Sequence, residues 1–267
     1  MVRFWHTIRL VFLERMAYRA NLFLEVIGGI IASVIVIVLW SAIYRGAGQD
    51  MIGGYSLPEM VTYLLGAGLI NSFILTTADN PEASLAIKEG DLSGLLIRPM
   101  SPHLFWLARD VGNKGFFLLL GLAGYTAVLV FFRDSLLPPP GPGHLLLFLV
   151  SVGLAAVVQY LVFQVLGLLA FWMENTYGIL FAARVVMEVV AGAIIPLSFF
   201  PRIFHDLFLL LPFPLMIYLP MRIYLGKIPL DQVPPELGKG IIWIAGLVLL
   251  YRLIWARGIR QYVSMGD

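Results

Sequence analysis

Long runs of apolar residues dominate the chain, and polar residues interrupt them only at intervals. A bilayer core about 30 Å thick needs about 20 mainly apolar residues per helix, so runs of this length between charges, Gly or Pro predict membrane-spanning helices. Six windows meet this description: residues 20–44, 58–78, 115–132, 144–172, 177–200 and 240–255. We therefore predict an all-α integral membrane protein with six transmembrane helices, forming one transmembrane domain over residues 1–267.

The distribution of basic residues predicts how this domain is oriented. Six spans place both ends of the chain on one side, and Lys and Arg in short loops are retained in the cytoplasm. With the N-terminus inside, twelve of the eighteen Lys and Arg residues fall in inner segments. Four of the other six lie in the long stretch 201–239, where the rule is weakest. We predict an N-in, C-in topology.

Residues 1–19 are predicted to form an amphipathic helix on the cytoplasmic face of the membrane. Their apolar residues recur at spacings of three and four: Phe4, Trp5, Ile8, Val11, Phe12 and Met16. Arg9 and Arg15 occupy other positions, and the charges in this segment exclude a cleavable signal peptide. The alternative interpretation is a frayed basic tail, because the polar face is not clean.

The connection 79–114 is too polar to span the membrane and too apolar for a simple linker. Residues 83–89 can form a short helix before Gly90, and Leu92, Leu95 and Leu96 form a second apolar ridge that Pro99 ends. Short helices with one apolar edge at the membrane face are what docking of a cytoplasmic partner requires. The alternative is an interfacial loop that only covers the base of the bundle.

Proline residues divide the outer stretch 201–239 into apolar pieces too short to cross a bilayer. Residues 203–211 fit a half-helix that re-enters the outer leaflet. Irregular backbone at that depth is tolerated only where protein or a water-filled cavity covers it. We therefore expect this re-entrant segment at a subunit contact or at the exit of a pathway.

Two charged residues, Arg184 and Glu188, fall inside the fifth window. Burying a charge in the membrane costs free energy, so a charged residue within a span is a candidate functional residue. Four residues apart on a helix, they can neutralise each other. A subunit contact and a role toward a substrate or an ion are the alternatives. No carboxylate is clearly placed near the middle of a span, since Glu25 and Glu59 lie near span ends.

Composition narrows the possible functions. The chain is 60% hydrophobic and only 13% charged, with a mean hydropathy of +0.90, whereas soluble domains carry about 25% charged residues. The absence of cysteine excludes disulfides and thiol chemistry. The net charge of +2 gives no argument for nucleic acid. No P-loop motif occurs, and the four histidines are scattered, so we expect no ATP site, no metal site and no bound cofactor.

Several segments together resemble a known family. These are residues 87–100 (Ile-Lys-Glu-Gly-Asp-Leu-Ser-Gly-Leu-Leu-Ile-Arg-Pro-Met), residues 171–178 (Phe-Trp-Met-Glu-Asn-Thr-Tyr-Gly), residues 192–201 (Gly-Ala-Ile-Ile-Pro-Leu-Ser-Phe-Phe-Pro), Leu211-Pro-Phe, and Tyr224-Leu-Gly-Lys227. With six spans and an amphipathic start, the chain resembles the ABC type-2 exporter permeases. More narrowly, it is similar to the bacterial branch in which two permeases accompany one separate ATPase.

The resemblance implies a permease subunit in the bacterial inner membrane, driven by ATP and Mg²⁺ bound to a cytoplasmic ABC ATPase subunit, beside a second permease that is identical or homologous. It implies a coupling helix formed by Ile87, Lys88, Glu89, Gly90, Asp91, Leu92, Leu95 and Arg98. It further implies that the broken outer segment caps a pathway lined by the first, second and fifth spans. Candidate residues at a subunit contact or the pathway are Arg184, Glu188, Pro196 and Pro201.

Two other classes of protein compete with this interpretation. A stand-alone secondary carrier or channel would need an ionisable site at mid-membrane and often an internal repeat, and inspection of the sequence finds neither. A membrane-embedded enzyme or a scaffold is the third possibility. The segment 79–114 discriminates among them, because only the permease needs it to dock an ATPase.

Overall fold

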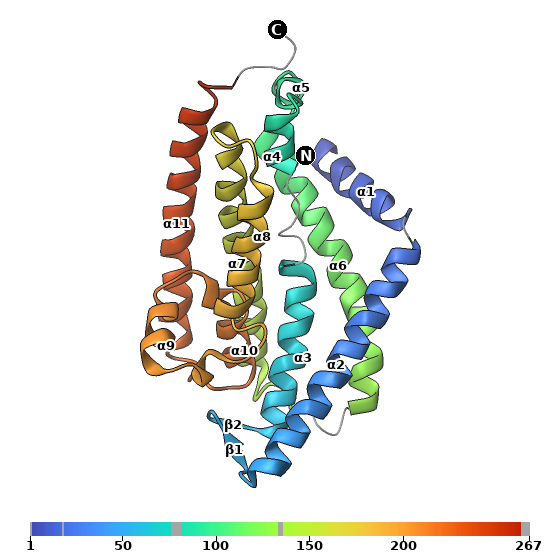
Figure 1. Ribbon diagram of the computed structural model, residues 1–267, viewed down its shortest axis with the longest axis vertical. Helices are drawn as coiled ribbons and strands as arrows, with labels where there is room; N and C mark the ends of the chain where they lie inside the picture. Colours follow the sequence, from blue (N-terminus) through green and yellow to red (C-terminus); the bar gives the residue numbers. More distant parts are fainter. Residues whose placement is uncertain (1, 18, 76–81, 133–135, 263–267) are drawn as a thin grey trace.

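The computed structural model describes residues 2–17, 19–75, 82–132 and 136–262, which form an elongated helical bundle (Figure 1). The first half of the chain contains α1 (Val2–Met16), α2 (Arg19–Ala47), the hairpin β1 (Met51–Ile52) and β2 (Tyr55–Ser56), α3 (Leu57–Ile74), α4 (Glu82–Lys88), α5 (Leu92–Leu96) and α6 (Pro102–Phe132). The second half contains α7 (Pro142–Gly167), η3 (Leu168–Phe171), α8 (Tyr177–Val190), η4 (Leu197–Phe199), α9 (Arg202–Leu209), η5 (Phe213–Leu215), α10 (Tyr218–Tyr224) and α11 (Val233–Gly258).

The architecture is almost entirely helical, as predicted. Within the described residues, four segments are long and apolar enough to cross a membrane: Ile27–Ala47, Leu57–Ile74, Pro142–Phe171 and Val233–Gly258. They correspond to the first, second, fourth and sixth predicted windows. A fifth is added if the bent pair Arg202–Leu209 and Phe213–Tyr224 counts as one broken span.

The other two windows differ from their prediction in extent. The third window forms only the second half of α6, which begins at Pro102, so residues 102–114 are helical rather than loop. The fifth window contains α8, which ends at Val190. Gly192 then adopts a left-handed φ of 79°, and Pro196 precedes a separate short helix. With about 1.5 Å of rise per residue, the 14 residues of α8 cover about 21 Å, less than a bilayer core.

The outer proline-rich stretch folds back on itself. α9 extends over Arg202–Leu209, close to the predicted half-helix 203–211, and none of its residues is buried. The chain then bends by 78° into the segment Phe213–Tyr224, which contains η5 and α10. Met216, Ile217 and Met221 in this segment are almost fully inaccessible. The proline positions explain the break, because a proline inside a helix removes a hydrogen bond and clashes with the preceding turn.

The main core lies between α3, α7 and α10. Met60 and Tyr63 of α3 contact this core, and both are fully buried. The Tyr63 hydroxyl donates a 2.8 Å hydrogen bond to the carbonyl of Gly192, which satisfies a backbone acceptor left open where α8 ends. This bond ties the middle of α3 to the break that follows α8.

The two ends of the bundle carry different structures (Figure 1). One end holds α1, α4, α5 and the described C-terminal residues. The other end holds the β1–β2 hairpin, which is fixed to α3 and to the segment after α10. There, Lys227 forms a 2.7 Å ion pair with Glu59 and donates a 2.9 Å hydrogen bond to the carbonyl of Gly54.

Candidate functional site

The two short helices predicted in residues 79–114 are present as α4 and α5. Gly90 separates them and adopts a φ of 82°, a conformation that a side chain disfavours. α4 is closed by the Glu89 N–H donating 2.8 Å to the carbonyl of Leu85, and α5 begins with the Ser93 N–H donating to the carbonyl of Gly90. A sharp turn at Gly90 therefore folds the pair into a compact element.

The predicted coupling residues divide into a buried and an exposed set. Ile87, Leu92 and Leu95 are buried against the protein's own side chains. Lys88 and Gly90 are half-buried. The exposed set consists of Glu89, Asp91 and Arg98. Ile87, Leu92 and Leu95 thus face the bundle, whereas Leu96 of the predicted ridge is exposed together with the charged positions.

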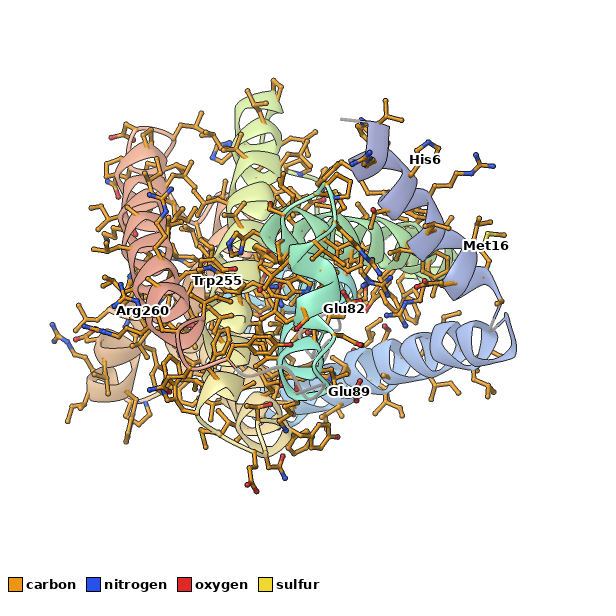
Figure 2. The ribbon with its side chains drawn as sticks, turned by 90° about the horizontal axis from the view of Figure 1, so that it is seen from above. His6, Met16, Glu82, Glu89, Trp255 and Arg260 are labelled. Carbon is orange, nitrogen blue, oxygen red and sulfur yellow. The ribbon has the colours of Figure 1, made fainter. Side chains whose placement is uncertain are left out.

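The buried ridge rests on the ends of three long helical segments. Trp106 of α6 and Leu168 of η3 are inaccessible members of the same cluster. Tyr251 and Trp255 of α11 pack against it. In the view from above, Glu82 and Glu89 mark the two ends of α4, which lies between α1 and the end of α11 marked by Trp255, with Arg260 just beyond it (Figure 2). The element is therefore seated on α6, η3 and α11.

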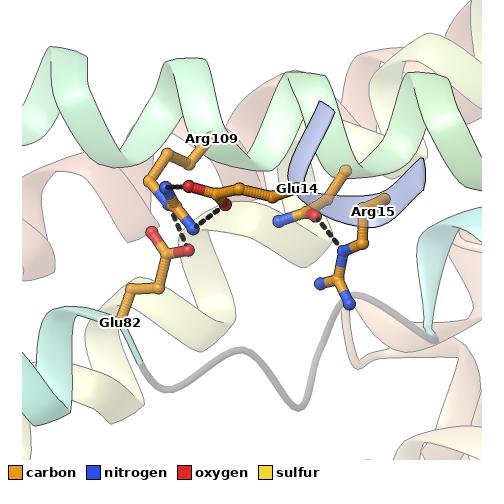
Figure 3. A network of polar contacts seen from close by, with 5 residues as sticks. Glu14, Arg15, Glu82 and Arg109 are labelled. Carbon is orange, nitrogen blue, oxygen red and sulfur yellow. Dashed lines mark hydrogen bonds and ion pairs between the residues drawn. The ribbon is translucent and has the colours of Figure 1, made fainter. Parts of the chain in front are cut away.

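An arginine on α6 ties α4 to the amphipathic helix α1 (Figure 3). Arg109 forms an ion pair with Glu82 at the start of α4 and a 3.0 Å ion pair with Glu14 of α1. Burial lowers the pKa of Arg109, but its contacts with Glu82 and then Glu14 outweigh burial and raise the pKa above its ordinary value. Beside it, Arg15 donates 2.9 Å to the side-chain oxygen of Asn113.

α1 also packs directly on α6. Gly112 lets the two helices approach closely, because a Cβ built there would lie 3.0 Å from the Cβ of Val11. Phe12 meets Phe116 edge to face at 5.6 Å. The amphipathic N-terminal helix predicted from the sequence is thus confirmed as a helix, and its contacts hold it to α6 rather than leave it frayed.

Two further contacts connect α4 and α5 to other parts of the chain. The buried hydroxyls of Ser84 in α4 and Thr176, immediately before α8, hydrogen-bond to each other. The Tyr262 hydroxyl donates 2.7 Å to the carbonyl of Gly90 and accepts from the backbone N–H of Ser93 at 3.2 Å. The element is therefore fastened to α8 and to the segment that follows α11.

A histidine lies beneath this element in an aromatic environment. His103 hydrogen-bonds through Nδ1 to the Tyr251 hydroxyl, and its ring meets Trp255 edge to face at 4.4 Å. Burial lowers the pKa of His103, because the charged imidazolium loses hydration there. The neutral ring is the form that this packing favours.

The outward side of α5 and the residues after it combine apolar and charged side chains. Ile97 is 87% exposed, and Leu85 and Leu96 are also exposed. They lie on the same short element as exposed Glu89 and Arg98. We name Leu85, Glu89, Asp91, Leu96, Ile97 and Arg98 the end patch.

The candidate residues for a subunit contact or the pathway lie elsewhere in the bundle. Arg184 and Glu188 of α8 form a 3.2 Å ion pair, as their spacing predicts, and each side chain is partly exposed. Pro196 is buried ahead of η4, whereas Pro201 is exposed ahead of α9. None of the interactions described for these four residues joins them to α4 or α5.

A buried ion pair on α6 escaped the sequence interpretation. Asp110 and Lys114, four residues apart, contact each other, and Lys114 also lies over the Tyr160 ring at 5.8 Å. Burial raises the pKa of Asp110 and lowers that of Lys114, while their mutual attraction opposes both shifts. Their spacing of four residues is compatible with an ion pair on a helix, but the charges in this stretch predict a loop.

Among the described residues, no group of three or more His, Asp or Glu side chains could hold a metal ion. The site is a short helical element that side-chain contacts join to α1, α6, α8 and α11, and it carries an exposed patch at one end of the bundle.

Comparison with known proteins adds one finding. A family model described as "ABC-2 family transporter protein" matches residues 30–266, which is most of the chain. A search of curated proteins finds no match.

Proposed function

The chain belongs to the ABC-2 transporter family, and we propose that it is the permease subunit of an ATP-binding cassette exporter, driven by ATP that a separate subunit hydrolyses. The observation that carries this proposal is the end patch. It presents exposed apolar and charged side chains on an element that is itself firmly seated in the bundle. A chain without a P-loop needs a surface on which an ATPase subunit can dock and through which the movement of that subunit can be transmitted.

The contacts of α4 connect the end patch to other helices, so that movement of a docked ATPase subunit can be transmitted to them. A displacement of α4 acts on α6 through Arg109, on α8 through Ser84 and Thr176, and on the C-terminal segment through Tyr262. Packed interiors resist compression, so a push on a seated element is passed to its neighbours rather than absorbed. ATP-driven closure of the partner would in this way reach several spans at once.

The two sets of predicted coupling residues receive different roles in this proposal. Glu89, Asp91 and Arg98 contact the ATPase subunit, together with Leu96 and Ile97. Ile87, Leu92 and Leu95 hold the element on the bundle, and Gly90 provides its turn. Lys88, at the last turn of α4, is half-buried and lies beside the patch.

The remaining features of the proposal concern the assembly. We place six spans in the bilayer, with residues 115–132 in the second half of α6 as the third and with α8 and the turn after it as the fifth. The N- and C-termini and the end patch lie on the cytoplasmic side of a bacterial inner membrane. α9 and α10 form an outer re-entrant cap, and a second permease, identical or homologous, completes the pathway. ATP and Mg²⁺ bind the partner ATPase, and no nucleic acid takes part.

Purification of the tagged chain from its native membranes tests the proposal. The measurement is the amount of ATPase subunit retained, determined by mass spectrometry, for the wild type, Ile97→Asp and Met51→Asp. Met51 is 56% exposed on the hairpin at the other end of the bundle and serves as the matched control. Ile97→Asp should lose the ATPase subunit, whereas Met51→Asp should retain it.

Two results would contradict the proposal. One is a wild-type chain that reproducibly purifies without an ATPase subunit, which would favour a stand-alone carrier. The other is specific ATP binding by the purified chain alone, since the proposal places every nucleotide on the partner. Equal retention by Ile97→Asp and the wild type would remove the end patch as the docking surface.

A further inference from the structure

A cavity of about 500 Å³ lies between α2, α3 and α6, away from the end patch. Its walls include Gly29 and Ser33 of α2, Leu64 and Ser72 of α3, and Tyr125 of α6. The first four residues belong to segments long and apolar enough to cross a membrane. The volume is in the range of sites that bind small molecules, about 300–1,000 Å³.

The side of the cavity formed by α3 and α6 is closed by close helix contact. A Cβ at Gly68 would collide with the Tyr125 hydroxyl, and a Cβ at Gly121 would lie 2.6 Å from the Ser72 hydroxyl. Small residues here do what they do in other membrane bundles, which is to let two helices approach. α3 and α6 therefore form a closely packed wall of the cavity.

The α2 side is different. At Gly29, no heavy atom lies within 4 Å of the position a Cβ would occupy, so no neighbouring segment fills the space that its missing side chain leaves. Ala32 of α2 and Ile194 line the cavity and are themselves exposed, so the cavity opens at the surface of the bundle beside α2. In a bilayer this opening faces lipid, so a lipid-soluble molecule can reach it from the membrane.

The chemistry of the lining indicates what such a molecule is. None of the described lining residues is an Asp, Glu, Lys, Arg or His. A charged group would therefore enter this apolar site without a counter-charge, which is costly. The Ser33 hydroxyl donates 2.8 Å to the carbonyl of Gly29, and the Ser72 hydroxyl donates 2.7 Å to the carbonyl of Leu69. Each oxygen can still accept a hydrogen bond from a ligand, and Tyr125 adds a third hydroxyl. A few polar groups in an otherwise apolar site fix the orientation of a ligand.

We propose that this cavity binds a neutral amphiphile, a molecule with a flexible hydrocarbon chain and an uncharged hydrogen-bonding head, which enters from the bilayer beside α2. This inference rests on the proposed function, and it names the substrate class of the exporter. The apolar walls take the chain, and the hydroxyls of Ser33, Ser72 and Tyr125 take the head. Lipid-facing access at α2 means that the substrate is collected from the membrane rather than from water.

Three photoreactive probes with the same diazirine-bearing chain test the proposal: a fatty alcohol, its trimethylammonium analogue and its sulfate ester. Each is applied to the complex purified from native membranes, and labelled peptides are identified by mass spectrometry. The alcohol should label peptides of α2, α3 and α6 that line the cavity, and excess unlabelled alcohol should compete. The two charged probes should not label these peptides above background.

The two adjacent glycines of α2 offer a matched pair of variants. Gly28 is exposed, lies outside the lining and also has open space around its Cβ position, whereas Gly29 lines the cavity. Gly29→Phe should reduce labelling by the alcohol about tenfold, and Gly28→Phe should leave it within about twofold of the wild type. Gly29→Leu gives a smaller obstruction, and competition on the unaltered protein needs no variant at all.

Three results would overturn the proposal: labelling unchanged in Gly29→Phe, equal labelling by the charged probes, or labelling that excess alcohol does not compete. Loss of the second permease from Gly29→Phe preparations, with Gly28→Phe unaffected, would instead assign the cavity to a subunit contact and would also overturn it. Each result is scored only where the ATPase subunit still purifies with the chain. Failure of this inference is thereby separated from failure of the proposed function.

Discussion

Tyr262, close to the C-terminus, donates its hydroxyl proton to the carbonyl of Gly90, at the turn between two short helices far away in the sequence. The same hydroxyl accepts from the backbone N–H of Ser93. One side chain therefore bonds both to the donor and to the acceptor that pair with each other across the α4–α5 turn. In the proposed permease, this contact makes the position of the coupling element depend on α11.

Replacement of Tyr262 by Phe should loosen this turn without unfolding the bundle. A typical intramolecular hydrogen bond contributes about 1 kcal/mol, so local opening should become about fivefold more frequent. Amide hydrogen exchange of peptides covering residues 89–97 measures this change. Tyr177→Phe is the control, because the Tyr177 side chain is 67% exposed. Unaltered exchange in Tyr262→Phe would show that the hydroxyl does not hold the turn.

Substitutions of two neighbouring glycines should have opposite effects on thermal stability. Gly90 has a φ of 82°, so Gly90→Ala forces a Cβ into the left-handed region and should cost about 1–2 kcal/mol. Gly94 lies inside α5 with nothing within 4 Å of its Cβ position, so Gly94→Ala should stabilise by up to about 1 kcal/mol. The unfolding temperature in mild detergent distinguishes them. Equal shifts for both variants would refute the strained turn.

Much of this architecture can be predicted from the sequence, because the length of an apolar run and the residues of a turn determine the structure close to them. The windows over 58–78 and 240–255, and the turn at Gly90, depend on composition near each position. The extent of α6 was not predictable in the same way. The charges of Arg109, Asp110 and Lys114 predict a loop. In the fold they lie on a helix, because Arg109 pairs with Glu82 of α4 and Asp110 pairs with Lys114.

The direction in which the coupling residues face could not be predicted from the local sequence pattern, for a related reason. An apolar ridge such as Ile87, Leu92 and Leu95 has the same spacing whether it packs on its own bundle or on a partner. Only the tertiary fold, which brings Trp106 and Leu168 against it, shows that the ridge faces inward. The end of α8 did have a signal, since Gly192 and Pro196 both disfavour a continuing helix.

The two ion pairs of Arg109 should differ in strength. Glu82 and Arg109 are both mostly shielded, whereas the Glu14 side chain is 55% exposed. Double-mutant cycles with Arg109→Gln, Glu82→Gln and Glu14→Gln should give a coupling energy of about 1 kcal/mol for Glu82 and about 0.3 kcal/mol for Glu14. High salt should weaken the Glu14 coupling more. A larger coupling for Glu14 would mean that α1, rather than α4, is the main partner of Arg109.

The stability of the α4–α5 end should depend on pH through His103. Burial lowers the pKa of this histidine in the folded protein, while the pKa of a histidine in the unfolded chain is about 6.5. Between these two values the unfolded state binds more protons, so stability rises with pH in this window. The stabilisation is complete above about pH 6.5, and it is lost as the pH falls toward the folded value.

Replacement of His103 by Gln should remove this dependence, because the amide keeps a polar group opposite the Tyr251 hydroxyl but carries no titratable proton. The measurement is the unfolding temperature between pH 5 and pH 8 for His103→Gln and the wild type. His6→Gln is the matched control, since His6 is exposed on α1. The wild type and the His6 variant should lose stability together on acidification, and the His103 variant should lose less. Parallel curves for all three proteins would assign the acid sensitivity to other groups, and His103 would then be only a packing residue.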